Sequence, residues 1–165
     1  LGARSQTEDR ETMEQLLALR QVSLFAHLSL DQLEAIRRAT RTAQWMEGEV
    51  VVREGDPGTE LFVLLEGEVE VYRERGSSEP ALLNRLAPVS YFGEIAILGE
   101  ERRSATVVAS RDATLLSLGG DRLKELILQT PEISFEIFRG LITRIRAAEQ
   151  RLEEIGPEEH SPEER

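Results

Sequence analysis

The first apolar series in the chain predicts a short amphipathic helix that begins at Thr12 and carries Met13, Leu16, Leu17 and Leu19. A second helix is predicted after Ser29, whose hydroxyl is a good N-cap for a segment with Leu33 and Ile36 on one face. The first eleven residues are polar and show no such series. We therefore expect a flexible segment over residues 1–11 and a helical region over residues 12–42.

The pattern changes near residue 43 to short apolar stretches separated by turn residues. Residues 68–73 alternate between polar and apolar side chains, which is the period of a half-buried strand. Valine-rich stretches and frequent glycines are typical of several such strands joined by turns. The strands predicted in this way are 43–47, 49–54, 61–66, 68–74, 81–86, 105–109 and 113–118. So many short strands favour a mainly β region over residues 43–119, built as a sandwich, a roll or a barrel.

Helical spacing returns over residues 120–156. Asp121 is a suitable N-cap for a first helix, and Pro131 opens a longer one. The longer helix carries apolar residues three and four positions apart: Phe138, Leu141, Ile145, Ala148, Leu152 and Ile155. Because this series is shorter than a typical coiled coil, it fits either a face packed on the same domain or the seam of a homodimer. We expect residues 157–165 to form an acidic tail.

Composition excludes several classes of site. The chain has 165 residues, no cysteine and only two histidines, His27 and His160, which excludes disulfides, thiolate metal sites and a multi-histidine zinc site. Its net charge is −11 and it has no clustered basic stripe, so we expect no nucleic-acid binding by this chain. The longest apolar run, Leu61 to Leu65, is too short for a membrane segment. We expect a cytoplasmic location, as part of a larger signalling, transport or channel protein.

One segment, residues 91–107, carries the candidate chemistry. A glycine leads into a single predicted helical turn, Glu94 to Leu98, whose free N–H groups can bind an anion. Arg103 follows nine residues after Glu94, and its planar fork can reach the same anion. Glu94 can accept hydrogen bonds from sugar hydroxyls, so a ligand with a phosphate and a free hydroxyl would use both residues. The alternative is a buried ion pair between Glu94 and Arg103 that serves structure only.

The same segment carries a resemblance to a known family. The stretch FGEIAILGEERRSATVVA resembles the phosphate-binding cassette of the cyclic nucleotide-binding domain family, and GEVVVREGDPGTELFVLLEG resembles the first strands of that family. The resemblance covers roughly residues 16–155. It implies a mainly β fold with flanking helices, an eight-stranded β-roll of the jelly-roll type (a double-stranded β-helix). The cassette would lie at residues 92–107, with N-terminal helices before the roll and hinge and lid helices at residues 120–156.

The resemblance implies roles for eight residues. Glu94 would accept a hydrogen bond from the ribose 2′-OH, and Arg103 would bind the cyclic phosphate. The remaining contacts would come from Gly93, Ile95 and Ala96 at the turn, Ser104 and Ala105 at the phosphate, and Val71 in the apolar wall. Ser104 leaves a guanine contact open, while Ala148-Glu149 stands where similar bacterial activators carry a Thr-Ser pair that contacts adenine. The expectation of cAMP over cGMP therefore follows only the more frequent ligand of the family.

We therefore expect a regulatory module and not an enzyme, with cAMP or cGMP as its ligand and no metal or cofactor. Ligand binding would repack the C-terminal helices, with Leu123, Leu126 and Ile127 as the packing face of the hinge helix. A metal-dependent cupin enzyme shares the roll but needs histidines, which the predicted strands lack. The remaining alternative is a degenerate domain of the same fold that acts only in protein–protein interaction or oligomerisation.

Overall fold

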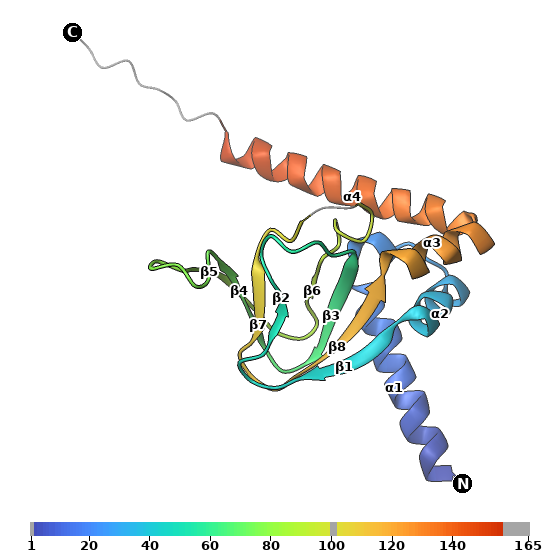
Figure 1. Ribbon diagram of the computed structural model, residues 1–165. Helices are drawn as coiled ribbons and strands as arrows, with labels where there is room; N and C mark the ends of the chain where they lie inside the picture. Colours follow the sequence, from blue (N-terminus) through green and yellow to red (C-terminus); the bar gives the residue numbers. More distant parts are fainter. Residues whose placement is uncertain (1, 100–101, 157–165) are drawn as a thin grey trace.

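In chain order, eight strands follow one set of helices and precede another in the computed structural model, which describes residues 2–99 and 102–156. The N-terminal set consists of α1 (Gly2–Arg20), the 3-10 turn η1 (Ser23–Phe25) and α2 (Leu30–Ala39). The C-terminal set consists of α3 (Gly120–Gln129) and α4 (Glu132–Ile155). In space, α1, α2 and α3 lie together beside the strands (Figure 1). The strands are β1 (Arg41–Trp45), β2 (Val50–Val52), β3 (Glu60–Glu66), β4 (Val69–Arg73), β5 (Ala81–Leu86), β6 (Tyr91–Phe92), β7 (Thr106–Ala109) and β8 (Ala113–Gly119).

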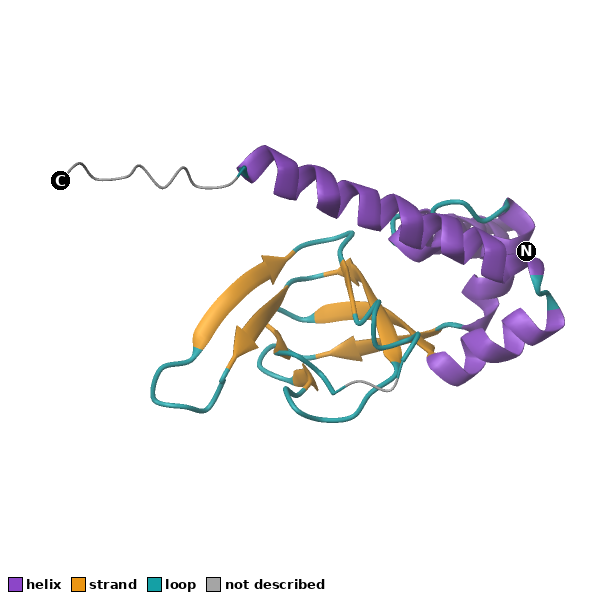
Figure 2. Cartoon of the chain, turned by 90° about the horizontal axis from the view of Figure 1, so that it is seen from above, coloured by secondary structure: helices purple, strands orange, loops and turns teal. Residues whose placement is uncertain are grey.

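The strands form two four-stranded antiparallel sheets, in the orders β1-β8-β3-β6 and β2-β7-β4-β5. Most neighbours within a sheet are distant in the sequence, which is the connectivity of a roll rather than of a meander. Viewed from above, the helices gather beside the sheets and not between them (Figure 2). The predicted fold class, a mainly β roll of eight strands with helices at both ends, is confirmed.

The two sheets enclose a core of aromatic and aliphatic side chains. The inner strand β3 is buried on both faces from Leu61 to Leu64, which explains its continuous apolar run. The ring of Phe62 stacks on that of Phe92 with their centroids 5.0 Å apart, and it meets Trp45 edge-on. Other buried members of this cluster are Leu64, Val69, Val107, Ala109, Ala113 and Leu115. The stacking fixes β6 against β3 and so fixes the start of the cassette.

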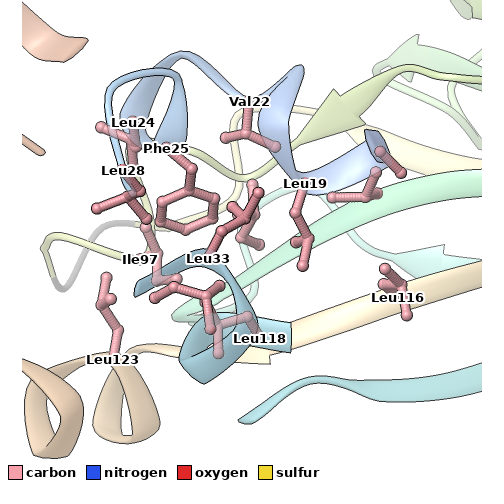
Figure 3. Packing of buried hydrophobic residues seen from close by; sticks show 14 of the residues in the cluster. Leu19, Val22, Leu24, Phe25, Leu28, Leu33, Ile97, Leu116, Leu118 and Leu123 are labelled. Atoms are coloured by element: carbon pink, nitrogen blue, oxygen red, sulfur yellow. The ribbon is translucent and has the colours of Figure 1, made fainter. Parts of the chain in front are cut away.

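A second core joins the helices to the roll (Figure 3). The fully buried ring of Phe25 in η1 lies beside Leu28, Leu33 and Ile97. Leu123 of α3 belongs to the same cluster, as do two isoleucines from the first turns of α4. Since Ile97 is part of the cassette turn, the cassette and the C-terminal helices share one core. A shift of the turn must therefore be accommodated by the helices, because close-packed interiors transmit displacement.

The N-terminal prediction is corrected by α1, which begins at Gly2 rather than near Thr12. The segment predicted to be flexible, residues 1–11, is helical over its described residues 2–11. This stretch contains no proline and many strong helix formers, so it can be helical although it lacks the apolar face from which a helix is predicted. An ion pair one turn apart, between Arg10 and Glu14 at 3.0 Å, supports the exposed part. The predicted acidic tail, residues 157–165, lies outside the described residues.

The start of a strand, a missing strand and a helix cap also differ from the sequence prediction. β1 begins at Arg41, two residues before the predicted β region, because its pairing with β8 extends to Ser117. β6 is absent from the predicted strands, because two residues are too few to show an alternation. The N-cap of α3 is Gly119, not Asp121, whose carboxylate lies in the first turn and favours the positive end of the helix. None of these changes moves the cassette.

The helix α4 starts on the helical core and then runs past the cassette (Figure 1). A Cβ on its buried Gly140 would lie 2.2 Å from the carbonyl oxygen of Ser23, so close packing on η1 sets the helix position. Leu141, from the predicted apolar series, is half-buried against the core of its own domain. The other members are exposed: Phe138, Ile145, Ala148, Leu152 and Ile155. Within residues 2–99 and 102–156, neither α4 nor any other helix is long and apolar enough to span a membrane.

Candidate functional site

A cavity of about 390 Å³ lies where the roll, the cassette and α4 meet. All eight residues predicted for the site line it: Val71 of β4, Gly93, Glu94, Ile95 and Ala96 of the turn, and Arg103, Ser104 and Ala105 before β7. Six residues that were not predicted complete the lining: Val52, Tyr91, Phe92, Arg102, Val107 and Arg144. The cavity therefore combines an apolar wall from the strands with three arginines and one glutamate.

The cassette forms the predicted helical turn. The N–H of Ile97 donates to the carbonyl of Gly93 at 3.2 Å, and the N–H of Leu98 donates to that of Ile95 at 3.1 Å. Gly93 has a φ of +82°, and a Cβ on it would lie 2.4 Å from the carbonyl oxygen of Glu60. Only glycine combines this conformation with this close approach. The turn is thus pinned at its start against β3, and Ile97 anchors its other end in the helical core.

Arg103 places a buried positive charge at the cavity. The residue is 9% exposed, its Nη1 donates to the carbonyl of Glu60 at 3.0 Å, and its guanidinium carbon lies 5.7 Å from the centre of the Phe62 ring. No carboxylate of the described residues lies within 4.0 Å of its nitrogens. Burial lowers the pKa of Arg103, and the nearby charge of Glu60 opposes this. A buried cation without an ion-pair partner is costly unless an anion binds there.

Glu94 is the buried negative charge of the cavity. It is 6% exposed, and its Oε2 accepts a 2.6 Å hydrogen bond from Nη1 of Arg144. Its Oε1 is buried without a hydrogen-bond partner. Burial raises the pKa of Glu94, while the charge of Arg144 and the backbone N–H of Leu24 act in the opposite direction. One carboxylate oxygen is therefore committed to α4, and the other has unused capacity to accept a hydrogen bond.

The structural alternative left open by the sequence, an ion pair between Glu94 and Arg103, is not formed. Glu94 pairs with Arg144 instead, and Arg103 is held by the backbone of β3. The two charges of the cassette thus stay separate, each with hydrogen-bonding capacity left over. Such an arrangement suits a ligand that presents an anion and a hydroxyl group together.

Arg144 is a charged residue of the cavity lining that was not predicted from the sequence. It lies on α4, 41 positions after Arg103, and its side chain is 44% exposed. The sequence analysis examined Ala148 and Glu149 for contacts to the ligand, but neither lines the cavity. Arg144 stands one helical turn before Ala148, on the same face, which is the signal that could have identified it.

Two other contacts link the cavity lining to its surroundings. Tyr91 lines the cavity and packs against the helical core. Its hydroxyl shares a 2.8 Å hydrogen bond with the hydroxyl of Ser23 in η1. Arg102 donates from Nη1 to the carbonyl of Gly55 at 2.7 Å, which ties the segment before β7 to the loop after β2. Both contacts hold the cassette to neighbouring elements without occupying Arg103 or Glu94.

Residues 42–130 match the family model described as the cyclic nucleotide-binding domain. The chain belongs to this family. The matched range contains the whole cassette and all of the roll except Arg41, whereas Arg144 lies beyond it. The chain is therefore a cyclic nucleotide-binding regulatory domain, of a family of ligand-binding modules and not of enzymes.

Individual relatives agree with this assignment. Over 127 residues, 77% of the chain, it is 38% identical to a cyclic nucleotide-gated potassium channel of Mesorhizobium japonicum, of which it spans 34%. The N-terminal domain of a transcriptional regulator from Streptomyces coelicolor superposes with a TM-score of 0.75 at 28% identity, covering 82% of this chain and 94% of that one. The regulatory domain of Toxoplasma gondii PKA with cAMP superposes with a TM-score of 0.65 at 27% identity, covering 70% and 44%. The chain spans between 28% and 63% of the length of the curated relatives compared.

Proposed function

We propose that this domain binds cAMP in the cavity and that binding is coupled to the packing of α4. The observation that carries the proposal is the pair of unsatisfied charged groups in one cavity: Arg103 without an ion-pair partner among the described residues, and Glu94 with a buried free oxygen. A cyclic nucleotide presents a phosphate and a ribose 2′-OH on the same sugar. It can therefore satisfy both groups at once.

Arg103 would bind the cyclic phosphate. Its guanidinium is planar and carries parallel N–H donors, which suits two phosphate oxygens. The hydroxyl of Ser104 and the backbone at Ala105 line the cavity next to it and would complete the contacts. Because the guanidinium is already buried, its desolvation cost has been met on folding, and the ligand gains a strong charge-assisted hydrogen bond.

Glu94 would bind the ribose. Its free Oε1 can accept the 2′-OH while its Oε2 keeps the hydrogen bond from Arg144. A deoxyribose would leave Oε1 buried and unpaired, so the site should discriminate against 2′-deoxy analogues. This contact explains why a carboxylate stands in a site that otherwise favours anions.

The base would lie against the apolar strand residues of the lining, Val52, Val71 and Val107. Support for adenine comes from the similar regulatory domain of Toxoplasma gondii PKA, whose structure contains cAMP. The hydroxyl of Ser104 could form a hydrogen bond with guanine. If cGMP binds as well as cAMP, removing this hydroxyl is the substitution that tests the contact.

The coupling to α4 would run through Glu94 and Ile97. A ligand on Oε1 favours the same position of the Glu94 side chain that Arg144 requires, so ligand binding and docking of α4 would support each other. Ile97 carries any movement of the turn into the core that it shares with Leu123. The hinge face expected from the sequence is consistent with this path, since Leu123 is buried and Leu126 and Ile127 are half-buried against that core.

Calorimetric titration with cAMP and with cGMP tests the ligand choice, and we expect tighter binding of cAMP. Hydrogen exchange with and without ligand tests the coupling, and we expect slower exchange over residues 132–155 when cAMP is bound. Equal affinities would contradict the preference for adenine. Exchange in α4 that is insensitive to bound cAMP would contradict the coupling. A chain that binds neither nucleotide would be the degenerate interaction domain considered above.

A second function, homodimerisation through α4, is favoured by the exposed apolar side chains of that helix. Phe138, Ile145, Leu152 and Ile155 of the predicted seam are exposed, and Phe135 and Ile142 extend the same apolar surface. Sedimentation of the wild type beside a variant with Ile145→Glu and Leu152→Glu tests it. We expect a dimer that the variant loses, and a monomeric wild type would exclude this function for the chain.

A further inference from the structure

Arg103 separates the ligand cavity from a second hollow of about 460 Å³. Of the residues that line the second hollow, only Val52 and Arg103 also line the cavity. Gly58 and Glu60 belong to the second hollow alone. Any effect of Gly58 on a ligand in the cavity must therefore pass through a neighbour, and Arg103 is the side chain nearest to it.

Gly58 lies directly against the guanidinium. A Cβ on Gly58 would lie 2.4 Å from Nε, 2.7 Å from Nη2 and 2.9 Å from Cζ of Arg103, and these are its three nearest atoms. On another side of the guanidinium, a Cβ on Gly93 would lie 2.8 Å from Nη1. The guanidinium thus occupies a slot bounded by two glycines. A side chain at either position would displace it.

The backbone of β3 fixes the guanidinium within this slot. Nη1 donates to the carbonyl of Glu60, and the ring of Phe62 lies beneath the guanidinium carbon. The side chain of Arg103 is therefore oriented by the carbonyl of Glu60, the ring of Phe62 and the space left at Gly58. No carboxylate of the described residues forms an ion pair with it. Its charge remains available to an anion, and little ordering is left to be done when one binds.

We propose that Gly58 is a positioning residue for phosphate recognition, because the absence of its side chain leaves the space that the guanidinium of Arg103 occupies beside the cavity. This rests on the proposed function, in which Arg103 binds the cyclic phosphate. Gly58 does not touch the ligand. Its contribution is to the orientation of Arg103 before the ligand arrives.

The variant Gly58→Ala tests the role without disturbing the fold. Its nearest neighbours are atoms of one long side chain, and the backbone of Gly58 is not in the left-handed region, so alanine is tolerated there. We expect an unchanged or higher Tm together with a 10- to 100-fold weaker affinity for cAMP, roughly the value of one charge-assisted hydrogen bond. Gly119→Ala is the matched control, since a Cβ on Gly119 meets nothing within 4 Å, and its affinity should equal that of the wild type.

The double variant Gly58→Ala with Arg103→Lys tests whether Gly58 acts on affinity through Arg103. Lysine lacks the planar fork that the slot holds, so Gly58→Ala should have little further effect on affinity in that background. Equal losses from Gly58→Ala in both backgrounds would overturn the proposal. So would an affinity of Gly58→Ala equal to that of the wild type.

A measurement without nucleotide separates this inference from the proposed function. The Nε–H signal of Arg103 in the ligand-free protein can be assigned by its absence from the Arg103→Lys spectrum. We expect Gly58→Ala to shift and broaden this signal, and Gly119→Ala to leave it unchanged. If the wild type binds no cyclic nucleotide, the proposed function fails, and an Arg103 signal unaltered by Gly58→Ala would overturn the positioning role independently.

Discussion

The carboxylate of Glu94 and the guanidinium of Arg144 meet at 2.6 Å although 50 residues separate them in the chain. Glu94 belongs to the cassette turn and Arg144 to α4, so this ion pair ties the cassette to the C-terminal helix. Only one carboxylate oxygen takes part, and the other is buried and free. In the proposed function, this single side chain would hold the helix and a ligand hydroxyl together.

Replacing Arg144 tests this tie. In Arg144→Gln the buried carboxylate of Glu94 loses its cation, so the pKa of Glu94 rises further and α4 is held less firmly. Because Arg144 is partly exposed, we expect a modest loss, a Tm about 2–4 °C lower, measured by calorimetry. Hydrogen exchange in the second half of α4 should increase at the same time. The control is Arg146→Gln, an exposed arginine of the same helix, which should change neither value.

Gly140 gives a prediction in which two effects have opposite signs. Helix propensity alone favours Gly140→Ala by about 1 kcal/mol. The new Cβ would lie 2.2 Å from the backbone carbonyl of Ser23, however, and overpacking of this kind costs about 1–3 kcal/mol. We therefore expect Gly140→Ala to lower the free energy of unfolding in urea denaturation. A more stable variant would show that η1 does not hold α4 at this position.

The acid stability of the helical region should depend on Glu34. Hydrogen bonds from Arg37 and Arg38, with that from Arg37 as the main cause, lower the pKa of Glu34 from 4.5 to about 2. A carboxyl with a depressed native pKa binds fewer protons when folded, so its stabilisation is present above pH 4.5 and is lost as the pH falls towards 2.

The variant Glu34→Gln measures this contribution. It should have a lower Tm than the wild type at pH 7, and the difference should shrink as the pH falls below 4. Glu79→Gln, at an exposed position in the loop between β4 and β5, serves as the control and should show no such trend. A difference between Glu34→Gln and the wild type that is constant from pH 7 to pH 2.5 would contradict the assignment.

Apart from Val71, which the family resemblance implied, the parts of the site that could be predicted are those that are local in the sequence. The turn from Gly93 and the following Arg103 lie within one short segment, so residue type and spacing suffice to bring them to one cavity. Arg144 was missed, because its place in the cavity depends on how α4 docks on η1 through Gly140, and the sequence offers only its position one helical turn before Ala148. The same docking decides which face of α4 is covered, and this is why Leu141 packs inward while the rest of the predicted seam is exposed.

The fold shows the same division. The strands with several alternating or apolar residues were predicted with boundaries within a few residues. β6 was not, because its two residues are too few to show an alternation and are strand through their pairing with Phe62 and Val63 of β3. The first half of α1 was not predicted either, since it is polar on all sides and its helical state rests on propensity and one local ion pair, not on an apolar face.

The most direct test of the account is calorimetric titration of the wild type and of Arg103→Ala with cAMP, beside 2′-deoxy-cAMP on the wild type. Removing Arg103 takes away the buried partner of the phosphate, so we predict an affinity for cAMP at least about 30-fold weaker in Arg103→Ala. The deoxy analogue leaves Oε1 of Glu94 unpaired and should bind the wild type about 10- to 100-fold more weakly than cAMP. Equal affinities of the wild type and Arg103→Ala for cAMP would contradict the central claim that these charges form one cyclic nucleotide site.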